Sequence, residues 1–284
     1  MIFKNKILDA NWLDLETYNS CFKSKYNDSY LKSTESYKME TTKFRATTKY
    51  AGKLKILFEI IFANMTVATW KISKEGMLLE EKTKQNLFMR IFLPAECFDE
   101  YVFNGNSSLN IGLSSNIGRE FFKSIKNKDV INMYTVGDFD LVFEKKNLTT
   151  THSLQVTTSD FIVIQRSFPT YTSTPVELSG SDYSQFCRSF PTTTLSITKQ
   201  YGEITFSFNT GRSVKKLQCG VLNRDDLAII HREYYCEQLS RLSKMNSFSS
   251  APLLIYYEDD KPLCFIAKNP IGTMEIVIDQ KQDD

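Results

Sequence analysis

The spacing of apolar residues switches along the chain between helical and alternating, and the switches mark its elements. Ala51–Met65 is apolar at intervals of three and four residues, which predicts an amphipathic helix. Three more helices are predicted over Ser115–Ile125, which Ser115 can cap, Gly180–Phe190 and His231–Lys244. Short apolar runs bounded by turn residues separate these helices.

Those runs predict β-strands, and a glycine after two charged residues, as in Lys74-Glu75-Gly76, is typical of a hairpin turn. In the first half the strands are expected over Val67–Ser73, Met77–Glu80, Asn86–Pro94, Ser107–Leu113, Asp129–Thr135 and Phe139–Glu144. In the second half they are expected over Val176–Leu178, Thr194–Thr198, Ile204–Asn209, Ser213–Cys219, Pro252–Tyr257, Pro262–Ala267 and Thr273–Ile278. Each half thus follows the order helix, strands, helix, strands, which predicts two copies of one α+β plan.

The domain organisation follows from this repeat. We expect an N-terminal extension over residues 1–42, a first domain over 43–145, an interdomain connector over 146–174 and a second domain over 175–284. Within the extension, Asn19–Thr42 is polar and predicts a tether. Met1–Leu15 is too apolar to stay in water, so we expect it to dock. Deletion of residues 1–42 should then leave a folded two-domain body of lower stability or weaker assembly, and a tail whose removal changes nothing is the alternative.

Composition narrows the class of protein. With 42% hydrophobic and 24% charged residues the chain can bury a core, and 35 basic against 33 acidic residues leave a net charge of +2. This balance does not by itself indicate a nucleic-acid partner. No apolar stretch approaches the length of a membrane helix, and the charges among Met1–Asn11 argue against a signal peptide.

The chemistry-bearing residues are sparse. Six cysteines without a CxxC pair indicate buried thiols in a reducing compartment, and two histidines leave little for catalysis or metal binding. No GxxxxGK[ST] motif occurs, and acidic pairs such as Asp259-Asp260 are typical of turns. The sequence therefore predicts no enzyme, no metal and no cofactor.

Several motifs resemble the PCNA-type sliding clamps. The segment Phe44–Glu80 has Phe-x-Ala, a helix, Trp70-x-Ile72-Ser73 and a Gly76 hairpin, in the order of the family's opening. Similar matches follow in order at Asp140–Glu144, Phe186-Cys187-Arg188 and Asp260–Leu263, so the resemblance covers residues 44–284. The chain departs from the family pattern in three features, which are the extension, the Thr-rich connector and a pI near 8.1. These departures suggest a divergent member of the family, with a viral origin as one explanation.

The resemblance implies a two-domain DNA clamp, three copies of which close head to tail around duplex DNA and tether DNA polymerase and other replication proteins in the nucleus or a viral replication compartment. Helices would face the DNA and sheets would form the outer wall. Cations on the predicted helices then become DNA-binding candidates, because a sliding protein contacts phosphates rather than bases. They are Lys49, Lys53, Lys55, Arg119, Lys123, Lys126, Arg188, Arg232, Arg241 and Lys244. Ordinary solvated helix faces are the alternative.

The resemblance also implies two protein-binding surfaces. A groove for partner peptides would use Leu87, Met89, Phe161, Ile164, Phe168, Pro262, Val277 and Asp279. Subunits would join through two strand edges that comprise Ser153, Leu154, Val156 and Thr158, and Ser213, Val214, Lys216, Leu217 and Cys219. The alternatives are that Phe161–Ile164 packs on its own sheet and that both edges are paired within the chain.

Three other functions stay open at the level of sequence. The first is a checkpoint-type clamp subunit that works with two different partners. The second is a monomeric processivity factor that holds DNA by a basic face, which the pI favours. The third is a clamp-fold transcription scaffold. The mass in solution separates a ring from a monomer, and stimulation of a polymerase separates the replication role from the others.

Overall fold

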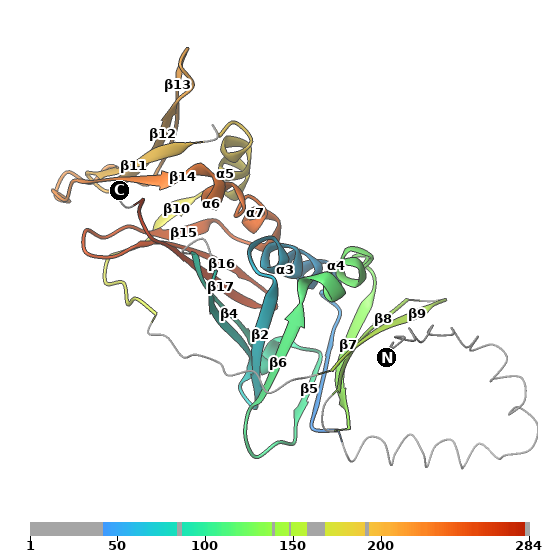
Figure 1. Ribbon diagram of the computed structural model, residues 1–284. Helices are drawn as coiled ribbons and strands as arrows, with labels where there is room; N and C mark the ends of the chain where they lie inside the picture. Colours follow the sequence, from blue (N-terminus) through green and yellow to red (C-terminus); the bar gives the residue numbers. More distant parts are fainter. Residues whose placement is uncertain are drawn as a thin grey trace, which may run out of the picture. The chain divides into compact units, whose positions relative to one another are not determined.

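A computed structural model describes residues 42–83, 87–137, 140–147, 149–157, 168–190 and 193–281 (Figure 1). Residues Thr42–Asp284 belong to one compact unit, and the predicted extension lies outside the described residues except for Thr42. The strands of this unit form three antiparallel sheets. None of the described helices is long and apolar enough to span a membrane.

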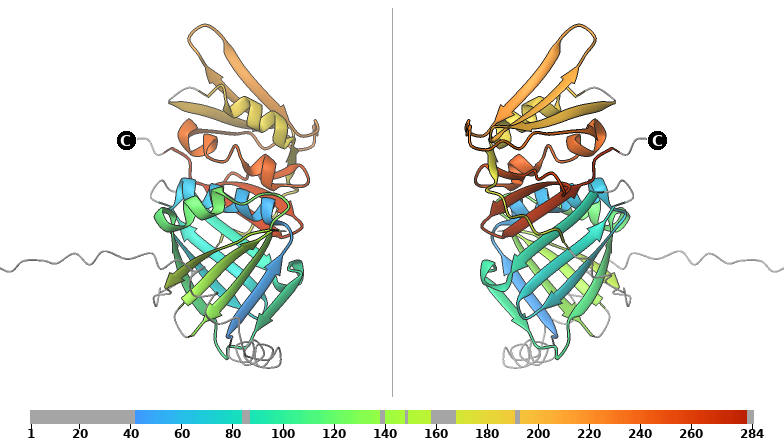
Figure 2. Two further views of the ribbon diagram at one scale, coloured as in Figure 1. Left: turned by 90° about the vertical axis from the view of Figure 1, so that its right-hand side faces the viewer. Right: turned by 90° about the vertical axis from the view of Figure 1, so that its left-hand side faces the viewer.

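The first sheet has five strands in the order β5 (Glu100–Phe103), β1 (Phe44–Thr48), β7 (Val130–Val136), β8 (Asp140–Lys146) and β9 (Thr151–Thr157). The third sheet has four strands in the order β13 (Val214–Cys219), β12 (Glu203–Asn209), β11 (Thr194–Gln200) and β14 (Ile230–Tyr235). In Figures 1 and 2, the hairpin of β12 and β13 extends away from the rest of its sheet.

The eight-stranded sheet joins the two halves of the chain. Its order is β10 (Val176–Leu178), β15 (Leu253–Tyr256), β16 (Leu263–Asn269), β17 (Gly272–Ile278), β4 (Leu87–Pro94), β3 (Gly76–Lys82), β2 (Val67–Ser73) and β6 (Leu109–Ser114). The seam is the antiparallel pair of β17 and β4, in which Val277 lies opposite Phe88 and Glu275 opposite Arg90. β2 and β4 both alternate between buried and half-buried residues, as expected for strands with one face on a core.

The helices pack against one another in a single layer. α3 (Ala51–Asn64) contacts both α4 (Ser115–Lys123) and α7 (Met245–Phe248), and α7 in turn contacts α5 (Gly180–Cys187). Two glycines allow close approach: a Cβ on Gly118 would lie 2.7 Å from the Phe62 ring, and one on Gly180 would lie 3.1 Å from the Asn246 backbone. A short α6 (Cys236–Ser240) follows β14, and a 3₁₀ turn, η1, covers Ala95–Cys97.

The core between helices and sheets is rich in aromatic rings. Phe58 of α3 stacks on Phe122 of α4 with ring centroids 3.7 Å apart, and both rings meet the edge of Phe143 in β8. In the second half, Tyr183 of α5 packs against Phe206 and Phe265. Burial of such rings is a large contribution to stability, and it fixes the helix layer to the sheets.

Several predicted elements differ from the structure. The predicted helix over His231–Lys244 is wrong, because Ile230–Tyr235 is a strand and a helix of only five residues follows it. In this strand Ile230, Arg232 and Tyr234 lie on the covered face, and the residues between them are exposed. Strands β1 and β5 were not predicted. Ser114, rather than Ser115, caps α4 by accepting from the Asn116 amide. The predicted connector over 146–174 contains β9, which pairs with β8 along its whole length.

Candidate nucleic-acid interface and partner surfaces

Two lysines of α3 cap the C-terminal ends of neighbouring helices. The Lys53 ammonium donates to the carbonyl oxygens of Ser247, Phe248 and Ser249 at the end of α7, at 2.8, 3.0 and 3.3 Å. The Lys55 ammonium donates to the carbonyls of Lys123 and Ile125 at the end of α4, at 2.8 and 3.2 Å. Cations are favoured at these ends because the last carbonyls of a helix lack partners. Lys53 and Lys55 therefore also hold the helix layer together.

Two arginines bind the carbonyl oxygens at the C-terminal end of α3 in the same way. Arg119 of α4 donates to the Phe62 carbonyl at 2.9 Å, and Arg241 donates to the Ala63 carbonyl at 2.7 Å while pairing with Glu237. Lys244 forms an ion pair with Glu59 at 2.6 Å. These contacts consume part of the hydrogen-bonding capacity of the side chains but leave their positive charge on the helix layer.

Lys49 and Arg232 lie outside the helices. Lys49 precedes α3 and pairs with Asp99 at 2.9 Å, a contact that raises the pKa of the lysine. Arg232 lies on β14, where its guanidinium donates to the carbonyls of Lys261 and Asp259 in the turn between β15 and β16. The sequence predicted a helix at Arg232. In the structure Arg232 lies on a strand, and its side chain binds the turn between β15 and β16.

Three of the predicted DNA-binding cations keep uncommitted side chains. Lys123, Lys126 and Arg188 are exposed, and within the described ranges their charged groups have no hydrogen-bond or ion-pair partner. Lys123 ends α4, Lys126 follows it closely, and Arg188 follows α5. They are thus the best placed of the ten residues to meet an external anion.

Both predicted strand edges lie at the ends of their sheets. β9 pairs only with β8, and β13 pairs only with β12, so each has one side without a strand among the described residues. On β9, Ser153 is exposed, Leu154 half-buried and Val156 6% exposed; Thr158 lies outside the described residues. On the other edge, Ser213 precedes β13, Val214 is 59% exposed, Lys216 is exposed, and Leu217 and Cys219 are half-buried.

On β4, the residues predicted to line the peptide groove face the core instead of the surface. Leu87 and Met89 are fully buried and face the core, so Phe88 and Arg90 are the residues on the outer face of the sheet. Phe161 and Ile164 lie outside the described residues. Val277 is 4% exposed, and Asp279 pairs with Lys82 at 3.3 Å. Phe168 packs on this outer face, against Phe88 and Arg90.

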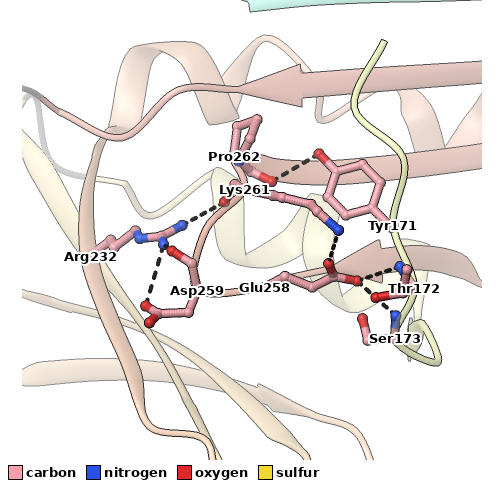
Figure 3. Close-up of polar contacts among 8 residues, drawn as sticks. All are labelled: Tyr171, Thr172, Ser173, Arg232, Glu258, Asp259, Lys261 and Pro262. Carbon is pink, nitrogen blue, oxygen red and sulfur yellow. Dashed lines mark hydrogen bonds and ion pairs between the residues drawn. The ribbon is translucent and has the colours of Figure 1, made fainter.

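Beyond Phe168, the connector is fastened to the turn between β15 and β16 (Figure 3). The Tyr171 hydroxyl donates to the Pro262 carbonyl at 2.9 Å, and the Glu258 carboxylate accepts from the amides of Thr172 and Ser173, each at 2.7 Å. Lys261 donates to the other oxygen of Glu258 at 2.5 Å. We call residues 171–173 with their partners Glu258, Lys261 and Pro262 the strap contact.

The strap contact sets the protonation of its carboxylate. Burial acts to raise the pKa of Glu258, but the hydrogen bonds from Lys261, Ser173 and Thr172 outweigh burial and lower the pKa to about 2. Glu258 therefore stays ionised at neutral pH. Next to it, an open cavity is lined by Arg232, Lys261, Pro262 and three carboxylates, of Asp259, Asp260 and Asp279.

Sequence reasoning missed the residues of the strap contact other than Pro262, and it missed Phe88 and Arg90. The available signal was Arg90 itself, the one charged residue in an otherwise apolar strand, because it favours the solvent side for position 90 and therefore also for position 88. The strap contact had no such signal, because it joins residues about 85 positions apart in the sequence. Within the described ranges, no cluster of three His, Cys, Asp or Glu residues could hold a metal ion.

One of three comparisons with known proteins identifies the fold. No protein-family profile matches the sequence, and no curated protein matches it. Among solved structures, the chain is similar to the crystal structure of proliferating cellular nuclear antigen (PCNA) from Entamoeba histolytica, with a TM-score of 0.74 at 13% sequence identity. The match covers 85% of this chain and 100% of that one. It does not bear on the viral origin raised by the sequence. The described chain has the α+β fold of a PCNA-type sliding clamp.

Proposed function

We propose that this protein is a DNA sliding clamp, a non-enzymatic polymerase processivity factor. Three copies would encircle duplex DNA in the nucleus and tether DNA polymerase and other replication proteins. The observation that carries the proposal is one continuous helix layer together with two strands, β9 and β13, which end separate sheets and have no second strand partner among the described residues. Likeness to PCNA in fold supports the same conclusion.

The contact with DNA uses phosphates only. Lys123, Lys126 and Arg188 are exposed beside the helix layer and free of partners among the described residues, which suits mobile, sequence-independent contacts. Lys53, Lys55, Arg119 and Arg241 contribute positive charge from fixed positions, because backbone carbonyls hold their side chains. Binding should therefore be weak, independent of base sequence and strongly dependent on salt.

Assembly uses the two free edges. A contact between β9 of one copy and β13 of the next joins different surfaces, and such head-to-tail contacts close into a ring when each turns by a third of a circle. Main-chain hydrogen bonds across the new strand pair would supply the specificity of register. This arrangement predicts a homotrimer in solution.

Topological retention tests the proposal. The protein is incubated with linear duplex DNA that carries biotin at both ends, the ends are then blocked with streptavidin, and the complex is challenged with high salt. A ring remains on blocked DNA and slides off DNA with open ends. Loss from both DNAs would contradict encirclement and would favour the monomeric factor that holds DNA by a basic face.

One observation favours a second candidate, a subunit of a ring built from different chains, as in the checkpoint-type clamps. The β13 edge carries Lys215 and Lys216, with Arg212 just before it, whereas β9 contains no acidic residue to meet them. Like charges or unmatched charges across an edge weaken pairing between identical copies. A monomeric mass at tens of micromolar protein would favour this candidate over the homotrimer.

A further inference from the structure

The outer face of the seam between β4 and β17 holds an arginine, Arg90, between two carboxylates. The Nε of Arg90 donates to Glu80 at 2.6 Å, and its Nη1 lies 3.6 Å from a carboxylate oxygen of Glu275. These two partners occupy edges of the guanidinium and leave its planar face open. Phe88, two residues earlier on the same face, adds an aromatic ring beside it. We call Phe88 and Arg90 the seam seat.

A residue from the chain's own connector fills the seam seat. The Cζ of Arg90 lies 4.3 Å from the centre of the Phe168 ring, and the Phe168 and Phe88 rings have centroids 5.3 Å apart with a tilt of 36°. Phe168 thus covers both members of the seat with one ring. A guanidinium face and an aromatic ring are the two surfaces against which a planar side chain packs well.

Phe168 is held near the seat by contacts that do not involve its own ring. Three residues further on, the strap contact fixes Tyr171, Thr172 and Ser173 to the turn between β15 and β16. The strap therefore keeps Phe168 at a high effective concentration over the seat, even when the ring leaves it. Phe168 is half-buried, so part of its side chain is accessible to solvent. The strap contact uses other residues, so it does not depend on the position of the Phe168 ring.

We propose that Phe168 is an intramolecular plug, which occupies the seam seat in the free protein and which any partner using this outer face must displace. The inference rests on the proposed function of tethering replication proteins, with the partner groove beside β4 that the resemblance implies. It adds a mode of regulation, in which the chain's own Phe168 competes with partners for the seam seat. A partner's apparent affinity is then lowered by the fraction of time that Phe168 spends in place.

The neutral apolar dye Nile red tests the plug, because it can bind the seat without regard to the charges of Glu80 and Glu275. The test compares the full-length protein with Phe168→Ala. Phe92→Ala is the matched control, because Phe92 lies on the same face of β4 and forms no aromatic ring pair with Phe168 among the described residues. We expect Phe168→Ala to raise dye emission several-fold with a blue shift, and Phe92→Ala to leave it near the wild-type level.

A double variant locates the dye. Removal of the seat ring as well, in Phe168→Ala/Phe88→Ala, should return emission toward the wild-type level, whereas a general loosening of the fold would leave it high. Phe168→Leu replaces the alanine variant if that one fails to fold, with a smaller rise expected. Equal dye binding by the wild type and the Phe168 variants would overturn the plug. Retention on end-blocked DNA is read separately, so loss of the clamp function leaves this result interpretable.

Discussion

The Lys53 ammonium lies 3.0 Å from the carbonyl oxygen of Phe248 and also binds the carbonyls on either side of it. Lys53 belongs to α3 in the first half of the chain, and Phe248 ends α7 in the second half. One side chain therefore joins the two halves at a helix end where positive charge is favoured. Lys53, which the sequence predicted to bind DNA, therefore also links the two halves of the fold.

Loss of this contact should destabilise the fold. We expect Lys53→Met to lower the free energy of unfolding by about 1–3 kcal/mol, because three charge-assisted hydrogen bonds disappear and the carbonyls at the end of α7 lose their partner. Lys123→Met is the matched control, since its ammonium has no partner among the described residues, and should change stability by less than about 0.5 kcal/mol. Urea unfolding measures both, and equal values would contradict the structural role.

DNA binding should depend most on the uncommitted cations. Replacement of Lys123, Lys126 and Arg188 by Ala should reduce the slope of log K against log salt by about 2 to 3, because each phosphate contact contributes about 0.9. Lys71→Ala/Lys74→Ala is the control, because these lysines lie on β2 and the hairpin turn after it, away from the helix layer (Figure 1). Fluorescence anisotropy on two unrelated duplexes gives the slopes. A slope unchanged by the triple replacement, or one that depends on DNA sequence, would refute this interface.

Proline on β13 should separate folding from assembly. Successive residues of a strand direct their N–H groups to opposite sides, so one of Lys215 and Lys216 donates toward β12 and the other toward the free edge. Of the variants Lys215→Pro and Lys216→Pro, we expect one to lower the melting temperature and the other to keep the fold but yield monomers. Light scattering gives the mass and calorimetry the melting temperature. Full-size assemblies from both variants would rule out the β13 edge as an interface.

The strap contact predicts a pH dependence. The pKa of Glu258 is lowered from its ordinary value of 4.5 to about 2 in the folded chain, so folding favours the ionised carboxylate. Its contribution is fully present above pH 4.5 and is lost as the pH falls toward 2. We expect Glu258→Gln to be less stable than the wild type at pH 7, with a gap that narrows below pH 4.5. Denaturant unfolding of both proteins across this range checks the sign; a gap that widens on acidification would contradict it.

The spacing of apolar residues predicted helices and strands well wherever the same spacing is buried in the structure. The predicted bounds of Val67–Ser73 and Val176–Leu178 are the observed ones, and Ala51–Met65 differs from α3 by one residue. The failure at His231–Lys244 has a physical cause. Ile230 and Tyr234 are four residues apart, a spacing that also fits a helix face. In the structure the segment pairs with β11, so Ile230, Arg232 and Tyr234 share the covered face of a strand.

The sequence by itself determined the two-part α+β plan, most of the strands, and the resemblance to sliding clamps whose fold the structure confirms. These depend on apolar period and turn chemistry, which are local. Only the tertiary structure decided which cations are free, because Lys53 and Arg119 bind carbonyls of helices 194 and 57 residues away in sequence. It likewise decided that Phe168 covers Arg90, a contact between segments that become neighbours only when β4 and β17 pair.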